Sequence, residues 1–475
     1  MVVPGSLGPF GSSLPGGPAG ENSRHGVFLQ SIRREPEEPG GLSRVRPISN
    51  PGESRMTIQR TNWAGNVTFA AARFSEPSSV GELQRLVAAG RNIRVHGTGH
   101  SFNRMAETTG DLVSLARLPG LVAIDRDRSR VTVGAATRYG ELGRQEQAAG
   151  FALHNTGSLP HIGIAGACAT GTHGSGNGNG NLSTAVSAIQ LVTADGDLVA
   201  FGREADGDEF NGMVLALGSL GVITGVTLDI VPTFDVRQDV YDDLPRAQFD
   251  THFDDILDDI IGGGYSVSAF SDFGAGGFTQ VWRKRRVEPG DAPAAEDTWL
   301  ESALAGTPRH PIRGMPTTHA TAQLGQAGPW NQRLPHFRLD FTPSGGAEIQ
   351  SEYLFPRRHA VAARQALDDI ADRIAAVLQI AEFRTVAADD LWMSPSHRAD
   401  SVALHFTWIP MPDFRRLLRS YDPGGKFRNE FVERWSWAAS GRRREPATWL
   451  HLPSVRHPSR GGRPTSRFRG QGAVR

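Results

Sequence analysis

The sequence predicts an α+β fold in two parts, and two observations carry that prediction. Between residues 62 and 231, short apolar runs alternate with single helices and tight turns, without the regular repeat of a βαβ array. After about residue 235 the strand patterns lengthen and aromatic residues become more frequent. A chain of 475 residues is long enough for two or three domains with buried cores.

The first part is predicted to contain two helices, two hairpins and two further strands. A serine cap precedes apolar residues at helical spacing from Ser78 onward, and Gly150 ends the second helix. An Asp-Gly pair at Asp195 suits the tight turn of the second hairpin. In order, the predictions are helix 78–87, strand 93–95, hairpin strands 121–124 and 131–133, helix 139–149, hairpin strands 189–193 and 198–201, and strand 222–231.

The second part is predicted to be a sheet with covering helices. Its strands are expected at 278–287, 338–342 and 348–354, and a long helix with repeated alanines is expected at 357–378. Such an arrangement would suit a cap over a binding site.

Composition excludes several classes of protein. Apolar residues make up 39% of the chain and charged residues 21%, with a net charge of zero. A general nucleic-acid or membrane-surface binder would need a basic excess, and no apolar run is long enough to cross a bilayer. The pair Arg33-Arg34 lacks the apolar stretch of an export signal, so we expect a cytoplasmic protein, and a monomer. Cys168 is the single cysteine, which rules out an intrachain disulfide.

The two ends of the chain have unusual compositions. Residues 1–55 are rich in Gly, Pro, Ser and Arg, which predicts disorder, and Met56 is a candidate natural start. Residues 433–475 are arginine-rich and lack apolar periodicity. A disordered or misread terminus is favoured there over a DNA-binding tail, because a charge run is weak evidence of function.

The first glycine-rich segment contains two histidines, His96 and His100, around Gly97 and Gly99. Two histidines four residues apart on a helix can bind zinc together. The glycines here disfavour a helix, so no metal site is predicted. A strand followed by glycines fits a loop whose backbone approaches a phosphate or a flavin edge. A glycine turn with a surface histidine is the alternative.

A longer glycine-rich segment covers residues 163–180. Its small side chains allow successive N–H groups to face an anionic ligand such as a pyrophosphate. A Rossmann fingerprint is disfavoured, since Leu159-Pro160-His161 is no buried strand. A flexible linker is disfavoured by the Ala, Thr, Cys and His residues within the segment.

These segments resemble the vanillyl-alcohol oxidase (PCMH) type of FAD-binding domain, and within it the bacterial alditol (xylitol) oxidases. The resemblance covers most of residues 60–410. It is carried by Asn62-Trp63-Ala64-Gly65-Asn66, Gly97-Thr98-Gly99-His100-Ser101-Phe102-Asn103, Gly157-Ser158-Leu159-Pro160-His161, residues 166–174, Leu220-Gly221-Val222, Gln350-Ser351-Glu352-Tyr353, Glu382-Phe383-Arg384-Thr385 and His405-Phe406-Thr407-Trp408.

The resemblance implies a two-part FAD-binding domain over 56–235, an α+β substrate-binding cap domain with an antiparallel sheet over 236–410 and a remnant of a C-terminal flavin-domain segment over 411–432. It also implies that FAD is bonded covalently to His100 through the flavin 8α-methyl carbon. Substrate groups correspond to Ser158, Glu382, Arg384 and Thr407, with His405 and Gln350 as weaker candidates, and Glu382 and Arg384 as the catalytic pair. The implied cofactor-binding residues are Val95, His96, Gly97, Thr98, Gly99, His100, Ser101, Ser158, Gly163, Gly166, Ala167, Cys168, Ala169 and Val222.

The implied reaction is oxidation of the terminal hydroxyl of a polyol such as xylitol or sorbitol, with dioxygen reduced to hydrogen peroxide. Charged groups such as Glu382 and Arg384 can orient a polyol and stabilise developing alkoxide charge. Two residues apart on a strand, they share a face, so a plain ion pair is the alternative and both interpretations can hold together.

The sequence departs from the family after Trp408. Relatives carry several dozen further residues there, including a lysine beside the flavin and substrate. The two lysines of this chain are Lys284, which lies far from that position in the sequence, and Lys426, which belongs to the terminal motif. Loss of a positioned charge commonly costs about a hundredfold in rate. The missing lysine leaves a catalytically defective flavoprotein as one alternative. A sugar-lactone (gulonolactone-type) oxidase or dehydrogenase, which shares the flavin motif, is the other.

Overall fold

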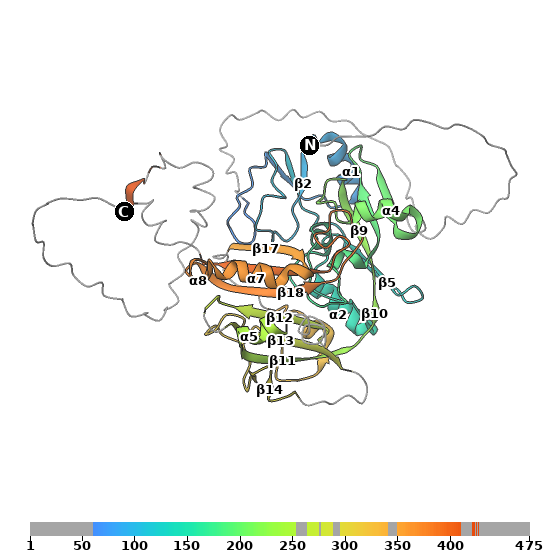
Figure 1. The fold of residues 1–475 in the computed structure, drawn as a ribbon. Coiled ribbons are helices and arrows are strands. Elements are labelled where there is room, and N and C mark those ends of the chain that lie inside the picture. Colours follow the sequence, from blue (N-terminus) through green and yellow to red (C-terminus); the bar gives the residue numbers. More distant parts are fainter. Residues whose placement is uncertain are drawn as a thin grey trace, which may run out of the picture. The chain divides into compact units, whose positions relative to one another are not determined.

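The computed structural model describes residues 60–252, 264–274, 277–287, 295–340, 349–409, 420–422, 424 and 426, all within the compact unit Ile58–Arg475 (Figure 1). The predictions for residues 1–55, for Met56 as a start and for the tail at 433–475 lie outside the described residues, as does most of 411–432. No helix in the described ranges is long and apolar enough to cross a membrane.

The N-terminal part begins with a small parallel sheet of order β1-β3-β2, packed against helix α1. Ser79 caps α1 by accepting a hydrogen bond from the backbone N–H of Glu82, as the serine pattern predicts. Leu83 and Val87 bury the helix face against Val113 and Val192. These elements are β1 (Arg73–Ser75), α1 (Val80–Ala89), β2 (Ile93–Val95) and β3 (Asp111–Val113).

A five-stranded antiparallel sheet of order β4-β5-β9-β7-β8 follows, and it confirms both predicted hairpins. Gly150 ends helix α2 with φ +83°, a left-handed conformation that glycine adopts at little cost. The elements are β4 (Val122–Asp125), β5 (Arg130–Gly134), α2 (Tyr139–Ala149), β6 (Phe151–Ala152), α3 (Ile164–Ala169), η1 (Leu182–Ala185), β7 (Val186–Val192), β8 (Leu198–Gly202), α4 (Arg203–Val214), β9 (Val222–Asp229) and β10 (Val231–Pro232), of which β6 and β10 pair with each other.

The second part is a nine-stranded sheet of order β14-β15-β11-β13-β12-β18-β19-β17, with β16 beside β11. Every strand pair in it is antiparallel, as the sequence predicts. Its elements are β11 (Asp235–Leu244), α5 (Arg246–Thr251), β12 (Ser266–Ser271), β13 (Phe278–Val287), β14 (Thr298–Trp299), β15 (Ser302–Leu304), β16 (Gly328–Pro329), η3 (Trp330–Gln332), β17 (Ile349–Pro356), η4 (Arg357–His359), α7 (Ala360–Asp368), α8 (Ala371–Ala375), β18 (Leu378–Val386) and β19 (Ser401–Trp408).

The two faces of this sheet differ because side chains alternate along each strand. One face is apolar and is covered by the helices, and α7 runs along the strands β17 and β18 in Figure 1. The residues of that core include Phe249, Val267, Ala269, Val281, Ala360, Ile374, Phe383, Leu404 and Phe406. The opposite face carries the polar residues of β17, β18 and β19, and it provides the floor of the candidate site.

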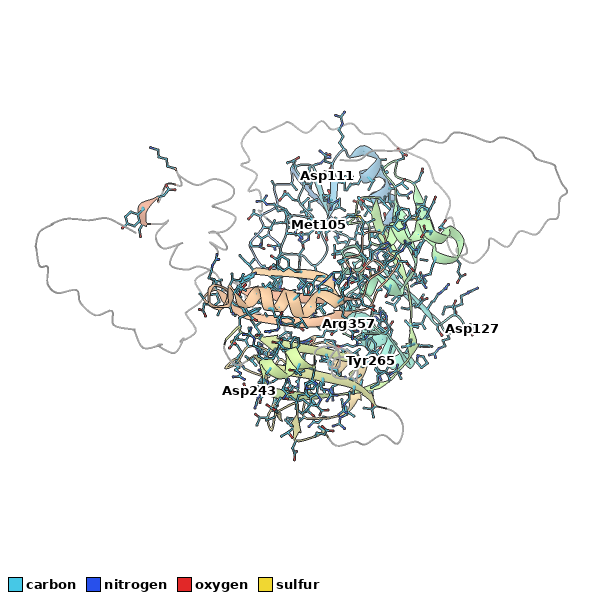
Figure 2. The ribbon with its side chains drawn as sticks, in the orientation of Figure 1. Met105, Asp111, Asp127, Asp243, Tyr265 and Arg357 are labelled. Atoms are coloured by element: carbon cyan, nitrogen blue, oxygen red, sulfur yellow. The ribbon has the colours of Figure 1, made fainter. Side chains whose placement is uncertain are left out.

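The two parts share a core instead of meeting through a simple linker. Trp330 and Leu334, from the segment assigned to the cap, pack into the apolar core of the N-terminal part with Leu142. Tyr265, labelled in Figure 2, donates its hydroxyl to the carbonyl of His154 and packs edge-on against Phe234, with ring centroids 5.4 Å apart. The limits at 235 and 410 stay predictions, although β11 begins at Asp235.

Three predictions of secondary structure are wrong. The helix expected over 357–378 is split into η4, α7 and α8, and Leu378 already belongs to β18. Consecutive acidic residues, Asp368 and Asp369, stand where the negative end of the helix dipole disfavours them. The strand expected from Arg338 does not form: Arg338 is irregular and Leu339 and Asp340 lie in a turn. The remaining residues, 341 and 342, lie outside the described ranges. The strand expected over 222–231 is interrupted after Asp229.

Glu146 generates a prediction about stability. It lies on the buried face of α2 with Tyr139 and Leu142, and neither carboxyl oxygen has a hydrogen-bond partner among the described residues. Burial raises the pKa of Glu146 from 4.5 to about 8. Because this folded-state pKa exceeds the unfolded value, the contribution to stability is complete below pH 4.5 and is lost as the pH rises toward 8.

We therefore expect Glu146→Gln to flatten the fall in the free energy of unfolding between pH 5 and 8.5. In the wild-type protein Glu146 contributes on the order of a few kcal/mol to that fall. Thermal denaturation across that range measures the effect. Glu209→Gln, which changes an exposed carboxylate on α4, is the matched control. An unchanged pH dependence in Glu146→Gln would contradict the assignment.

Candidate active site

The first glycine-rich loop follows β2 and holds His100 against an aromatic ring. The backbone N–H of His96 donates to Val113 at 2.8 Å and continues the strand pairing. At Gly99 the chain turns with φ +71°, and its carbonyl accepts from the N–H of Trp63 at 2.8 Å. A side chain there would meet the His96 ring at 3.1 Å, so the turn requires glycine. The His100 ring then stacks on Trp63, with centroids 5.2 Å apart.

His100 is a half-buried histidine whose ring nitrogens are shielded from solvent. Neither nitrogen makes a hydrogen bond of ordinary geometry to a described residue. Burial, together with the nearby charges of His161 and Arg138, lowers the pKa of His100 to about 4. The imidazole is therefore neutral at neutral pH, with a lone pair available to a partner outside the chain.

The second glycine-rich segment lies directly beside the first. The backbone N–H of Gly163 donates to the hydroxyl of Thr98 at 3.3 Å, which ties the two loops together at the start of α3. A Cβ added at Gly97 or Gly166 would meet nothing within 4 Å, so the backbone there borders open space. Open backbone next to buried, unpartnered ring nitrogens fits a large polar cofactor such as FAD.

Other residues predicted to bind the cofactor lie around these loops with their side chains in the protein. Ser101 hydrogen-bonds Asn103 at 2.9 Å. The thiol of Cys168 lies 3.3 Å from the Tyr139 hydroxyl inside the core, and burial raises its pKa to about 11. Val222 packs in the apolar cluster around α1. Contact of FAD with the residues Val95, Ser101, Ala167, Cys168, Ala169 and Val222 stays a prediction.

The polar face of the large sheet brings together the residues predicted to bind substrate. Glu382 on β18 lies opposite His405 on β19, which lies opposite Glu352 on β17. Arg384 is two residues along β18 from Glu382, so both side chains occupy the same face, as predicted. Thr407 pairs with Gln350 on β17 in the adjoining row, and its hydroxyl lies 3.5 Å from Nε2 of His405.

Arg384 is the centre of an ion-pair cluster on this face. Its Nη2 lies 2.6 Å from Oε1 of Glu352, and its Nε lies 3.7 Å from Oε1 of Glu382. Its Nη1 reaches the hydroxyl of Ser158 at 3.4 Å. The predicted residues Ser158, Glu382 and Arg384 are therefore in one place, although Ser158 belongs to the N-terminal part of the chain.

The charges of this cluster are maintained by their neighbours. Burial alone would raise the pKa of Glu382, but the charge of Arg384 and the hydrogen bond from His336 outweigh it, and the net shift is downward. Burial alone would lower the pKa of Arg384, but Glu382 and Glu352 raise it overall. Both groups are ionised across the neutral pH range.

Four residues of the cluster were missed by the sequence analysis. Glu352 holds Arg384, and its second oxygen lies 3.3 Å from Nε2 of His173. His336 places Nε2 at 3.2 Å from Glu382. Lys284, set aside because it lies far from the motifs in the sequence, is 1% exposed, and burial lowers its pKa to about 7 while Glu382 raises it. Alternation along β17 could have identified Glu352, two residues after Gln350.

No metal site is predicted, and the described residues hold no group of three or more His, Cys, Asp or Glu arranged to bind a metal ion.

Comparison with known proteins identifies the family. The FAD binding domain family matches residues 71–202. The alditol oxidase of Streptomyces sp. is 43% identical over 423 residues, covering 79% of this chain and 99% of that protein. The L-gulonolactone oxidase of Mus musculus is 32% identical over 181 residues, and the D-arabinono-1,4-lactone oxidase of Eremothecium gossypii is 36% identical over 184, covering 41% and 35% of those proteins.

A variant of the cholesterol oxidase of Brevibacterium sterolicum has a similar fold. It superimposes with a TM-score of 0.56, covering 81% of this chain and 87% of that one at 14% identity. This likeness confirms the predicted α+β architecture.

The Streptomyces alignment also bears on the expected loss of residues. Its 423 positions exceed 79% of a 475-residue chain, so it includes positions where the relative has residues and this chain has none. The location of that loss after Trp408 stays a prediction. With 43% identity along 99% of the Streptomyces alditol oxidase and an FAD binding domain at residues 71–202, the chain belongs to the alditol oxidase family and is an FAD-dependent oxidoreductase.

Proposed function

We propose that this protein oxidises the terminal hydroxyl of an alditol, such as xylitol or sorbitol, to the aldose. In the balanced reaction one alditol and one dioxygen give one aldose and one hydrogen peroxide. The observation that carries the proposal is the buried cluster of Ser158, Glu382 and Arg384, which offers hydroxyl, carboxylate and guanidinium groups on one face. The identity with the Streptomyces alditol oxidase supports the same substrate class.

FAD would be held by the first glycine-rich loop, Val95 to Ser101, and by Gly166 to Ala169 of helix α3, with Gly163 nearby. When bound, it supplies the capacity to accept two electrons from an alcohol. We propose that His100 carries it covalently. The neutral, unpartnered imidazole of His100 supports this role, since a protonated ring would have no lone pair for a new bond. Trp63 holds the ring by stacking.

The cluster on the sheet would bind and activate the alcohol. Arg384 can donate hydrogen bonds to the reacting oxygen and stabilise the negative charge that develops there as the hydroxyl proton leaves. Glu382 is kept ionised by Arg384 and His336, so it can accept hydrogen bonds from polyol hydroxyls or take up a proton. Ser158, Thr407, His405 and Gln350 would bind the remaining hydroxyls.

Oxidation of a sugar lactone is the second candidate function. The gulonolactone and arabinonolactone oxidases match less than half of their own lengths, which favours an alditol over a lactone. A third possibility is a flavoprotein with impaired turnover, supported by the alignment positions that this chain lacks. The protein would act as a cytoplasmic monomer.

The attachment of FAD can be tested without turnover. The full chain is purified and precipitated with acid, and the flavin absorbance of pellet and supernatant is measured. We expect the flavin to remain with the wild-type protein and to be released from His100→Ala. His154→Ala, which changes another half-buried histidine, is the control and should retain it. Release of flavin from the wild-type protein would contradict covalent attachment.

The substrate class is tested by steady-state production of hydrogen peroxide with xylitol and with L-gulono-1,4-lactone. We expect a higher kcat/KM for xylitol, and a loss of about a hundredfold or more in Glu382→Gln, because the charge beside the reacting oxygen is removed. Glu209→Gln serves as the control. A preference for the lactone would favour the second candidate, and retained flavin that no polyol reduces without oxygen would favour the impaired flavoprotein.

A further inference from the structure

Lys284 is a fully buried lysine on the polar face of the large sheet. It lies on β13 opposite Ser266 on β12, two residues from Trp282 on the same face. Its ammonium group donates to the backbone carbonyl of Leu334. The sequence motifs give Lys284 no role, yet a buried amine is costly unless its hydrogen bond and charge are used.

The segment that Lys284 holds also contacts the candidate active site through its backbone. Two residues after Leu334, the N–H of His336 donates to the carbonyl of Ser158 at 3.0 Å. The N–H of Phe337 approaches the same carbonyl at 3.4 Å. The position of Ser158 relative to the sheet therefore depends on residues 334–337.

The side chain of His336 contacts the second substrate-binding group. Its ring stacks on Trp282, with centroids 5.2 Å apart and an interplanar angle of 16°, and meets Phe270 edge-on at 5.8 Å. These rings aim Nε2 at Glu382, 3.2 Å away. His336 is 5% exposed, so water has little access to this contact.

We propose that Lys284 and His336 act as one positioning relay, in which Lys284 fixes the 334–337 segment and His336 then sets the geometry of Glu382 and Ser158. This inference rests on the proposed function only in naming Glu382 and Ser158 as groups that bind the alcohol. Neither Lys284 nor His336 touches the substrate in this role.

Electrostatics gives the relay a definite protonation state. Burial and, after it, the charge of Lys284 lower the pKa of His336. Glu382 raises it and Arg384 lowers it, and the net pKa is about 4. A neutral His336 carries a single N–H, and the carboxylate of Glu382 is the acceptor it faces. The charge of protonated Lys284 therefore favours the neutral form of His336, in which the ring can donate its N–H to Glu382 without placing a second positive charge beside it.

The kinetic test compares Lys284→Met, His336→Leu and the double variant with the wild-type flavoprotein, using xylitol. Each single variant is expected to raise KM about tenfold or more, with a smaller effect on kcat, because a hydrogen bond that orients a charged group is lost. The double variant should be no worse than the more affected single variant, since both substitutions break the same relay. His336→Gln retains an N–H donor and should recover most of the loss.

Arg285→Met is the matched control for the loss of a cation. Arg285 is the next residue of β13, and its side chain lies on the opposite face with Asp239. The KM of the Arg285→Met variant for xylitol should stay within about twofold of the wild-type value. Bound flavin, measured by absorbance, should be equal in all variants.

A second readout does not depend on turnover. In the full chain labelled with ring-¹⁵N histidine, the His336 signal is assigned by its absence from His336→Gln and followed as a function of pH. We expect the pKa of His336 to rise in Lys284→Met and to stay unchanged in Arg285→Met. If xylitol is not a substrate, the proposed function fails and this measurement still tests the relay.

Additive effects of Lys284→Met and His336→Leu on KM, or a His336 signal that ignores Lys284→Met, would overturn the proposal. Unfolding of Lys284→Met is detected by thermal denaturation, and Lys284→Gln, which keeps a donor to Leu334 without the charge, then takes its place. In Lys284→Gln, KM should stay near the wild-type value and the pKa of His336 should still rise. A large rise in the KM of Lys284→Gln, or an unchanged pKa of His336 in that variant, would overturn the relay.

Discussion

The buried guanidinium of Arg384 is the group on which the candidate site depends, because its charge must be compensated by neighbours on several strands. Glu352 on β17 lies 2.6 Å from this guanidinium. Glu382, which is on β18 like Arg384, lies 3.7 Å from it. Removing one partner of a buried ion pair commonly costs about 3–5 kcal/mol, since the remaining charge stays uncompensated. The pairing therefore constrains β17, β18 and β19 to one register.

That register also explains why the two parts of the chain need each other. The sheet buries its apolar face under α5, α7 and α8, which leaves the polar face to be covered by the N-terminal part. Ser158, whose hydroxyl contacts Arg384, comes from that part, and its carbonyl accepts hydrogen bonds from residues 336 and 337. Trp330 and Leu334 pack in the N-terminal core, so the loop between the strands is tied to both parts.

The site has two chemically different regions, one suited to attachment of the cofactor and one suited to binding of the alcohol. His100 lies in a loop rich in glycine, where burial lowers the pKa of its ring and keeps the ring neutral. Glu382 and Arg384 lie on a rigid sheet, where mutual attraction keeps both charged in spite of burial. A neutral nucleophilic ring suits attachment of a cofactor, whereas preorganised charges suit an alcohol whose oxygen becomes negative during oxidation.

Local patterns determined most of the first part of the fold and, in the second part, the face on which Glu382 and Arg384 lie. The serine cap of α1, the glycine that ends α2 and the alternation along β18 all act over a few residues, so their effects could be predicted from the chain alone. The glycine loops around His100 and Gly163 were likewise found because open backbone requires a local run of small residues. The alternation also placed Glu382 and Arg384 on one face before any tertiary information.

Only the tertiary structure decided which distant residues complete the site. Lys284 and His336 carry no local signal, since their roles arise from strand order and from a loop that crosses the polar face of the sheet. The same limit explains the helix predicted over 357–378, where Leu378 is drawn into β18 by pairing with β19. A strand position is settled by neighbours far along the chain, and a sequence pattern of a few residues does not contain them.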